Sequence, residues 1–429
     1  MNYLLPSRKT RIPGPKSRVL ARQLRRYESR NITYVSGHWP IFWQRASGAN
    51  VWDVDGNRYI DLTAAFGVAS VGHNNGRVVA ALKAQAGKLL HAMGDVHPNE
   101  LKLKLARELV GLTFGRWCRR VSAKRRSALH RIAATTSPGR VVFANSGAEA
   151  VEVALKTAVM HSKRAGVIAF EGAYHGLTYG ALDTTWRAHF RSPFTKQLGH
   201  FTAHVPFGRV PDVANIEDFG AVIVEPIQGR GGMVVPPDDF LPKLREFCDE
   251  HRLVMIFDEI YSGFCRAGRW FACEHWGVTP DVMCVGKALA GGLPISACIG
   301  RAEVMDSWPE SQGEAIHTST FLGNPLGCAA ALASLHEMKR MKLDKRSREL
   351  GKWLASRLAK IGKVRGKGLM LGLEVGDAVP LAEKLLQRGI LALPEGDHNE
   401  ILGLTPPLVI TKRQLEYCIG ELTKLISTR

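Results

Sequence analysis

Short runs of apolar residues alternate with longer amphipathic stretches through the middle of the chain. Six of these runs have the length of buried strands, at residues 141–144, 167–170, 221–224, 253–257, 282–285 and 295–299. The intervals between them carry apolar residues at helical spacing, most clearly over 148–162 and 240–251. Strands that alternate with helices indicate a mostly parallel sheet flanked by helices on both faces. The pattern therefore predicts an α/β fold for the large central part of the chain.

The two ends of the chain follow a different pattern. Residues 51–60 contain two short runs around Asp55-Gly56, which predicts a hairpin. Helical spacing recurs in further segments, at 77–91, 100–112, 326–339, 345–361 and 411–427. We therefore expect a smaller α+β domain built from both chain ends. The predicted division is an N-terminal segment of the small domain at 1–75, a large domain at 76–330, and the C-terminal part of the small domain at 331–429.

Length and composition narrow the class of protein. The 429 residues exceed what one compact core usually holds, and 45% hydrophobic with 23% charged residues is ordinary for a globular protein. The longest uncharged stretch, 318–335, contains Asn324 and Pro325 and does not predict a membrane span. The first residues lack an apolar signal core. Eight scattered cysteines without a CxxC pair indicate buried thiols in a reducing compartment. We therefore expect a cytoplasmic protein with neither disulfides nor a metal site.

The net charge of +19 is concentrated in two segments. Residues 1–30 contain nine basic residues and one acid, and residues 111–140 contain eight basic residues and no acid. Three interpretations of these segments stay open. They are solvated arms, or surfaces that contact an anionic membrane or an acidic partner. The first segment also resembles an organelle transit peptide. Pro13 and Pro15 are expected to interrupt any amphipathic helix near the start. We do not expect nucleic-acid binding, because few aromatic residues lie among the basic ones.

Residues that directly follow the predicted strands suggest a phosphate site. In an open parallel sheet, ligands bind outside the carboxyl ends of the strands. Residues 145–150, Asn-Ser-Gly-Ala-Glu-Ala, follow the first central strand and open a helix. Ser146 and Gly147 would place free backbone N–H groups and a positive helix end near a phosphate. An ordinary helix N-cap has the same residue types, so this motif alone leaves both interpretations open.

Two charged residues at other strand ends suggest a particular cofactor. Asp258 can stabilise a protonated pyridine nitrogen, and Lys287 can form a Schiff base when its amine is neutral. Either residue alone is more often an exposed loop charge. Together with the upstream phosphate site they meet the requirements of pyridoxal 5′-phosphate (PLP). Tyr174 could stack on its ring or simply lie at the edge of the core, and His175 could be structural.

Six motifs connect these residues to a known family. They are Asn-Ser-Gly-Ala-Glu-Ala (145–150), Tyr-His-Gly (174–176), Glu-Pro-Ile-Gln-Gly (225–229), Phe-Asp-Glu-Ile (257–260), Gly-Lys-Ala-Leu-Ala-Gly-Gly (286–292) and His-Thr-Ser-Thr-Phe-Leu-Gly-Asn-Pro (317–325). In order and spacing the chain resembles the class III (ω-type) aminotransferases, which include acetylornithine, ornithine and 4-aminobutyrate aminotransferases. The resemblance runs from about Pro13 to the C-terminus. It implies the fold-type I architecture of PLP-dependent transferases.

The resemblance also implies roles around the cofactor ring. Lys287 would be the catalytic Schiff-base lysine, and Asp258 the partner of the ring nitrogen. Tyr174 would stack on one face of the ring and Ile260 would pack on the other. Tyr261 stands where a Gln commonly faces the phenolic oxygen, and its hydroxyl can still make that hydrogen bond.

The phosphate contacts follow from the same resemblance. Gly147 and Ala148 would bind the phosphate through their backbone, with Ser146 and Glu225 among the other cofactor contacts. Thr320 would reach the phosphate of a neighbouring subunit. The resemblance therefore implies a homodimer with shared active sites.

Departures from the family pattern bear on the substrate. Arg230 stands where ornithine and 4-aminobutyrate types have a Glu, and Gly403 where they have the Arg that receives the α-carboxylate of glutamate or 2-oxoglutarate. We hypothesise that Arg230 supplies a relocated site for a carboxylate or phosphate of the substrate. The alternative is that it only pairs with a nearby surface acid. Trp39 is a further candidate for substrate contact.

The resulting prediction is a PLP-dependent aminotransferase. It would move an amino group from an amine or amino acid, with an ω-amino donor favoured, to an oxo-acid in ping-pong half-reactions. An aminomutase or racemase of the same fold would instead return the amine to the same carbon skeleton. A non-catalytic scaffold that uses the basic segments is the third alternative, and the intact Asp258–Lys287 pair argues against it. The basic arm could also bring the site to an anionic bilayer that carries an amphiphilic substrate.

Overall fold

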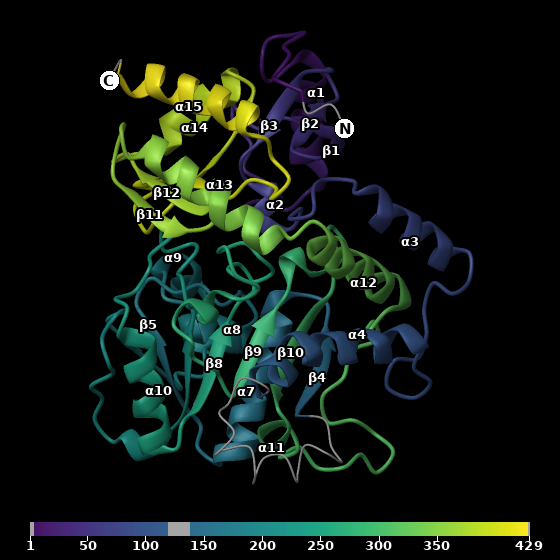
Figure 1. The fold of residues 1–429 in the computed structure, drawn as a ribbon, viewed down its shortest axis with the longest axis vertical. Coiled ribbons are helices and arrows are strands. Elements are labelled where there is room, and N and C mark those ends of the chain that lie inside the picture. The colour runs from purple at the N-terminus through teal and green to yellow at the C-terminus, as the bar shows by residue number, and fades with distance from the viewer. Residues whose placement is uncertain (1–3, 119–137, 428–429) are drawn as a thin grey trace.

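A seven-stranded sheet forms the centre of the computed structural model, which describes residues 4–118 and 138–427 (Figure 1). Its strands are β4 (Gly139–Ala144), β5 (Gly166–Phe170), β6 (Thr202–Val205), β7 (Phe219–Val224), β8 (Val254–Asp258), β9 (Val282–Val285) and β10 (Ser296–Arg301). They lie in the order β4-β10-β9-β8-β7-β5-β6. Pairing is parallel from β9 through to β6, whereas β10 is antiparallel to both β9 and β4. The predicted mostly parallel α/β sheet is confirmed.

All six predicted strands are present, and β6 is the strand that the pattern does not predict. Its four residues, Thr-Ala-His-Val, are mostly half-buried and form the edge of the sheet. An edge strand this short has too little alternation to stand out from a loop.

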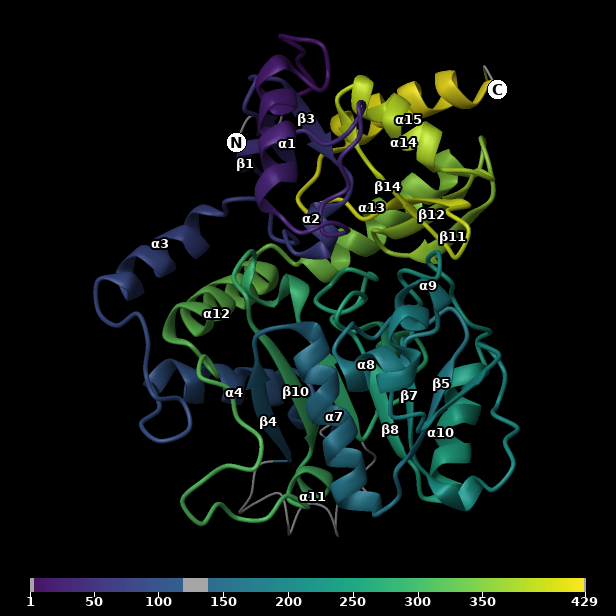
Figure 2. The same ribbon diagram turned by 180° about the vertical axis from the view of Figure 1, so that it is seen from behind.

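Helices cover both faces of the central sheet, as the two opposite views show (Figure 1, Figure 2). α7 (Gly147–Ser162) packs on one face, and α4 (Glu100–Leu112) and α10 (Phe240–His251) pack on the other. Side chains alternate between these faces along β7. Ile223 joins the apolar cluster of α7, whereas Val222 joins the cluster of α4 and α10. This two-sided burial explains why the central strands are continuous apolar runs in the sequence.

The chain ends form two smaller sheets, and the first of these contains strands from both ends (Figure 1). The first is β1 (Trp43–Ser47), β2 (Asn50–Asp53), β3 (Arg58–Asp61) and β13 (Ile390–Leu391), in that order. The second is β11 (Val364–Lys367), β12 (Met370–Glu374), β15 (Ile401–Leu404) and β14 (Leu393–Glu395), in that order. β2 and β3 form the predicted hairpin, and β13 from the far end of the chain pairs parallel with β3. The sheets explain how both ends build one smaller α+β unit, while the boundaries at residues 75 and 330 stay predictions.

The remaining helices belong partly to the smaller unit and partly to the central sheet. They are α2 (Ala64–Gly67), α3 (Gly76–Ala86), α5 (Phe114–Cys118), α8 (Tyr179–Thr184), α9 (Ala188–Arg191), α11 (Ala302–Met305), α12 (Pro325–Arg340), α13 (Leu343–Leu358), α14 (Val379–Gln387) and α15 (Lys412–Ser427). Beside the central sheet, α8 and α11 contact α7. α3 is shorter than the predicted segment because it ends at Gly87, its C-cap residue.

The expectation that prolines prevent a helix near the start of the chain is wrong. α1 (Pro15–Tyr27) begins at Pro15. Proline is favourable at the first helical position, because no hydrogen bond from its nitrogen is needed there and its φ angle already suits a helix. Pro13 precedes the helix and does not interrupt it.

Other expectations concern membranes, cysteines and the second basic segment. No helix within the two described ranges is long and apolar enough to cross a bilayer. Seven cysteines with described side chains are buried free thiols. Most of the basic segment 111–140 lies outside the described residues, which end at 118 and resume at 138.

A close contact between α13 and the smaller unit gives a stability prediction. A Cβ atom added to Gly351 of α13 would lie 1.9 Å from the carbonyl oxygen of Gly368, which is a backbone atom with no freedom to rotate away. We expect Gly351→Ala to lower the free energy of unfolding by about 1–3 kcal/mol or more, as overpacking does. Urea unfolding followed by circular dichroism measures this change.

Gly111→Ala in α4 is the matched control, because a Cβ added there meets no atom within 4 Å. We expect it to leave stability unchanged or to raise it by no more than about 1 kcal/mol through helix propensity. Equal destabilisation by the two substitutions would contradict the close approach of α13 to Gly368.

Candidate active site

Polar residues gather at the carboxyl edge of the central sheet, where it faces the sheets of the chain ends (Figure 1). Asp258 ends β8, Glu225 follows β7 directly, and Lys287 lies two residues after β9. Tyr174 lies four residues after β5, which runs parallel to β7. The sheet therefore brings together residues that are far apart in the sequence.

Lys287 lies in a strained and half-buried position. Its φ angle is +39°, in the left-handed region that non-glycine residues seldom occupy. Its amine Nζ lies 4.3 Å from the centre of the Tyr261 ring. Burial lowers the pKa of Lys287, although the carboxylates of Asp258, Glu225 and Glu395 act in the opposite direction. A lowered pKa raises the fraction of Lys287 whose amine is neutral and therefore nucleophilic.

Asp258 is held by two contacts. Its Oδ2 lies 2.9 Å from Nδ1 of His175, and its Oδ1 accepts a hydrogen bond from the backbone N–H of Ile260 at 3.0 Å. Asp258 and His175 are both buried. His175 Nε2 is buried without a hydrogen-bond partner among the described residues. His175 therefore fixes the orientation of the carboxylate, a role that the sequence left open.

Glu225 fixes two loops of the site. Its Oε2 accepts a hydrogen bond from the backbone N–H of Tyr174 at 3.0 Å, and its Oε1 accepts one from Gly229 at 3.1 Å. Burial raises the pKa of Glu225 to about 7. The Tyr174 ring packs edge-on against Phe190, with the ring centres 5.6 Å apart. Glu225 thus positions Tyr174 at the edge of the sheet.

The start of α7 forms the predicted helix N-terminus. Ser146 is its N-cap, and the Ser146 hydroxyl accepts a hydrogen bond from the backbone N–H of Glu149 at 3.2 Å. Gly147 and Ala148 begin the helix. A Cβ on Gly147 would lie 2.9 Å from Cδ1 of Ile260, so glycine permits the loop after β8 to approach α7 closely. The structure therefore places Ile260 beside the predicted phosphate site.

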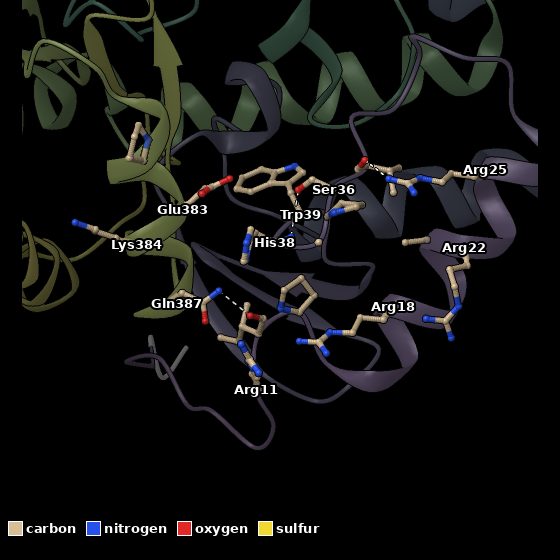
Figure 3. A pocket seen from close by; sticks show the side chains of 17 residues that line it. Arg11, Arg18, Arg22, Arg25, Ser36, His38, Trp39, Glu383, Lys384 and Gln387 are labelled. Atoms are coloured by element: carbon tan, nitrogen blue, oxygen red, sulfur yellow. Dashed lines mark hydrogen bonds between the residues drawn. The ribbon is translucent and has the colours of Figure 1, made fainter.

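Thr320 and Trp39 lie away from Lys287 within one chain. Thr320 is exposed, and the neighbouring Ser319 hydroxyl accepts a hydrogen bond from the Asn145 amide at 3.0 Å. Trp39 lines a separate cavity of about 800 Å³ between α1 and α14 (Figure 3). Basic side chains surround this cavity, namely Arg11, Arg18, Arg22, Arg25 and Lys384. The substrate role of Trp39 stays a prediction.

Arg230 has a partner that the sequence did not identify. Its Nη1 lies 3.4 Å from Oε2 of Glu395, at the end of β14. Its guanidinium carbon also lies 5.9 Å from the centre of the Tyr174 ring. Glu395 is buried and the Arg230 side chain is 30% exposed, so Arg230 does lie beside an acid, and its role toward a substrate stays a prediction. Glu395 lies in a tail with a mixed pattern, about 165 positions from Arg230, and no local motif identifies it.

These residues fit PLP chemically. A lysine of lowered pKa, a carboxylate anchored at a strand end and the N-terminus of a 16-residue helix meet at one edge of the sheet. They supply an amine for the aldehyde, a partner for the ring nitrogen and N–H donors for the phosphate. No group of three or more His, Cys, Asp or Glu residues in the described ranges is arranged to hold a metal ion.

Comparison with known proteins decides the family. The family model described as "Aminotransferase class-III" matches residues 33–426. The chain belongs to the class-III aminotransferases. Members of this family depend on PLP, so the protein is a PLP-dependent aminotransferase. The predicted resemblance, enzyme class and cofactor are confirmed.

Individual relatives cover nearly the whole chain. An acetylornithine aminotransferase of Methanosarcina mazei is 37% identical over 92% of this chain and 94% of its own length. A 4-aminobutyrate aminotransferase of Mycobacterium leprae is 34% identical over 97% of each chain. A solved ornithine aminotransferase of Toxoplasma gondii, described with partial occupancy of PLP at its active site, is 31% identical with a TM-score of 0.82 over 98% of each chain. These relatives are named for amino transfer, which favours this reaction over that of an aminomutase, a racemase or a non-catalytic scaffold.

The buried Glu395 gives a pH prediction that does not depend on catalysis. Burial raises the pKa of Glu395 from 4.5 to about 7, against the attraction of Arg230 and Lys287. Between pH 4.5 and about pH 7, Glu395 is protonated in the folded protein and ionised in the unfolded chain. The stability contributed by Glu395 is therefore fully present below pH 4.5 and is lost as the pH rises through 7.

We measure the free energy of unfolding of Glu395→Gln and of the original protein without PLP. As the pH rises from 5 to 8, we expect the difference between them to change in favour of the variant by on the order of 2–3 kcal/mol. Glu374→Gln is the control. Arg365 lowers the pKa of Glu374, so this carboxylate is ionised in both states over the same pH range and the difference should stay constant. A constant difference for Glu395→Gln as well would show that Glu395 is not protonated in the folded protein.

Proposed function

We propose that Lys287 and Asp258 are the centre of the aminotransferase site, and that its donors are ω-amines or amino acids with an ω-amino group. The observation that carries this proposal is the strained, burial-shifted Lys287 beside the carboxylate anchored by His175. The names of relatives support the donor class, since they act on acetylornithine and 4-aminobutyrate. An oxo-acid accepts the amino group in the second half-reaction.

Lys287 performs the proton transfers. Bound PLP supplies an electron-withdrawing ring that stabilises negative charge on the carbon next to the transferred nitrogen. With the cofactor bound, neutral Lys287 would be the base that accepts the proton of that carbon at Nζ and then, once protonated, the acid that returns it. Asp258 favours a proton on the ring nitrogen through its charge, and His175 with the Ile260 N–H keeps its carboxylate in place.

Other residues orient the cofactor. Tyr174 and Ile260 would hold the two faces of the ring, and Tyr261 lies beside the lysine amine. Gly147, Ala148 and the N-cap residue Ser146 hold the phosphate at the start of α7. Glu225 acts through Tyr174 and Gly229, whose backbone N–H groups donate hydrogen bonds to its carboxylate.

We propose that the active unit is a homodimer. Apolar side chains are exposed on one side of the molecule, at Leu89, Leu90, Met93, Val96, Ile316 and Phe321. The two segments that carry them contact each other. His91 packs against Phe321 with ring centres 5.3 Å apart, and Thr318 donates a hydrogen bond to Asp95 at 2.9 Å. A contiguous exposed apolar surface is typical of an interface. Thr320 belongs to this surface, from which it would reach the partner's phosphate site.

A cytoplasmic location and contact of the basic arm with anionic membranes also stay proposals. α1 carries Arg18, Arg22 and Arg25 toward the cavity that Trp39 lines (Figure 3), which supports binding of an anion there. Within the described ranges, these three arginines have no ion-pair partner.

The central test is the covalent link to Lys287. The purified protein with PLP should show the visible absorbance of lysine-linked PLP, and borohydride reduction should attach the cofactor to the peptide that contains Lys287. We expect Lys287→Ala to remove both signals and to lower kcat by more than about 10²-fold, the scale of a lost general base. Absorbance spectra, mass spectrometry of the reduced peptides and steady-state kinetics measure these effects.

Lys367→Ala is the control, because the Lys367 amine, at the end of β11, lies over the ring of Trp276. It should keep the absorbance, the label at Lys287 and the activity. A label on any other lysine, or a protein that stays colourless with PLP, would refute the assignment.

The dimer has a separate test. We expect Met93→Asp to shift the protein toward monomer and to weaken PLP retention, because an unpaired carboxylate is costly inside an apolar interface. Sedimentation velocity and the bound PLP content measure the two effects. Val210→Asp is the control, since Val210 is also exposed but follows β6 at the opposite edge of the central sheet. Unchanged assembly of Met93→Asp would contradict this interface.

A further inference from the structure

Arg230 and Glu395 form a poorly satisfied ion pair inside the active site. The closest distance between Arg230 Nη1 and Glu395 Oε2 is 3.4 Å, and Oε2 has no hydrogen-bond partner anywhere in the described parts of the chain. The backbone nevertheless holds the two residues together, because the N–H of Gly396 donates to the carbonyl oxygen of Arg230 at 3.0 Å. The two side chains are therefore close, but their contact is loose enough for a charged group of a ligand to replace it.

The two side chains differ in exposure. The Glu395 side chain is 2% exposed and the Arg230 side chain is 30% exposed. A buried carboxylate that lacks hydrogen bonds carries a desolvation penalty. A charged group that enters from solvent meets Arg230 first and then reaches Glu395.

Charged groups on several elements face Glu395. Lys287, Arg187 and Arg230 attract it, and Glu225 repels it. Arg187 donates a hydrogen bond from Nε to Asp397 at 2.9 Å, while its Nη2 is buried without a hydrogen-bond partner in the described ranges. Arg230 is thus the cation with the weaker carboxylate contact.

Glu395 occupies space that a glycine leaves open. A Cβ atom on Gly403 would lie 2.9 Å from Cγ of Glu395. β14 and β15 pair so that Leu393 lies opposite Gly403, and Glu395 therefore reaches over this position. A larger residue at 403 would force the Glu395 side chain to shift.

We propose that Arg230 and Glu395 are a charge-selecting subsite for the far end of the substrate. A distal carboxylate binds the Arg230 guanidinium in place of Glu395, and a distal ammonium binds the Glu395 carboxylate in place of Arg230. The substrates are therefore amines that carry a second charged group at the end remote from the transferred nitrogen. This inference rests on the proposed function, because it requires that the amine react at Lys287.

Three donors of four carbons test the subsite, since they differ only at the far end. 4-Aminobutyrate ends in a carboxylate, putrescine in an ammonium, and n-butylamine in a methyl group. The half-reaction of the holoenzyme with each donor is followed by loss of the absorbance of lysine-linked PLP. The original protein should prefer both charged donors to n-butylamine.

The variants separate the two charges. We expect Arg230→Gln to lower kcat/KM for 4-aminobutyrate by about 10–100-fold, the scale of a lost charge-assisted hydrogen bond, without affecting n-butylamine. Glu395→Gln should lower kcat/KM for putrescine to a similar extent and raise it for 4-aminobutyrate, because the competing carboxylate is gone. Arg187→Gln is the matched control, since it removes a cation that faces Glu395 but is paired with Asp397.

Several outcomes would overturn the subsite. They are equal rates for the three donors, equal losses on all donors in Arg230→Gln, or loss of the carboxylate preference in Arg187→Gln instead. Visible absorbance of lysine-linked PLP in every variant shows that the fold and the cofactor site are intact. A protein without that absorbance fails the proposed function, whereas a protein that reacts with n-butylamine but ignores distal charge fails this inference alone.

Discussion

The burial of one amine among three carboxylates is the constraint on which the site depends. Lys287 lies near Asp258, Glu225 and Glu395, and burial disfavours the charged form of each group that it affects. Each carboxylate has a different partner that offsets part of the cost of its burial. Asp258 has the His175 ring, Glu225 has two backbone N–H groups, and Glu395 has a loosely held arginine. The contact of Glu395 is the longest of these, at 3.4 Å against 2.9–3.1 Å for the contacts of Asp258 and Glu225.

Backbone geometry makes this arrangement possible. Parallel strands deliver their following residues to one edge of the sheet, so no long-range pairing of loops is needed. Small residues then permit close approach. Gly147 lets Ile260 pack against the start of α7, and Gly229 leaves room for the ring of Tyr261, whose Cδ1 would lie 2.3 Å from an added Cβ. The unfavourable φ angle of Lys287 is tolerated because the surrounding structure is tightly packed.

The sequence predicts those parts of the structure that depend on neighbouring residues. The six central strands, α7 with its N-cap Ser146, and the positions of Asp258 and Lys287 after their strands follow from local patterns. β6 escapes prediction because a short, half-buried edge strand has little alternation. The helix at Pro15 escapes because proline favours a helix start as well as opposing a helix interior. Glu395 could not be assigned, since only tertiary packing brings it to Arg230.

Arg230 and Gly403, the two departures from the family pattern, both lie beside Glu395. Both Arg230 and Gly403 differ from the residues of the ornithine and 4-aminobutyrate types, and each on its own would leave an unbalanced site. Arg230 without Glu395 would be a cation facing Lys287, which already experiences its repulsion. Glu395 with a side chain at position 403 would have to shift, because a Cβ atom on Gly403 would lie 2.9 Å from its Cγ. The glycine admits the carboxylate, and the carboxylate balances the arginine. Glu395 adjoins both of the other residues, so we expect the effects of substituting the three to be non-additive.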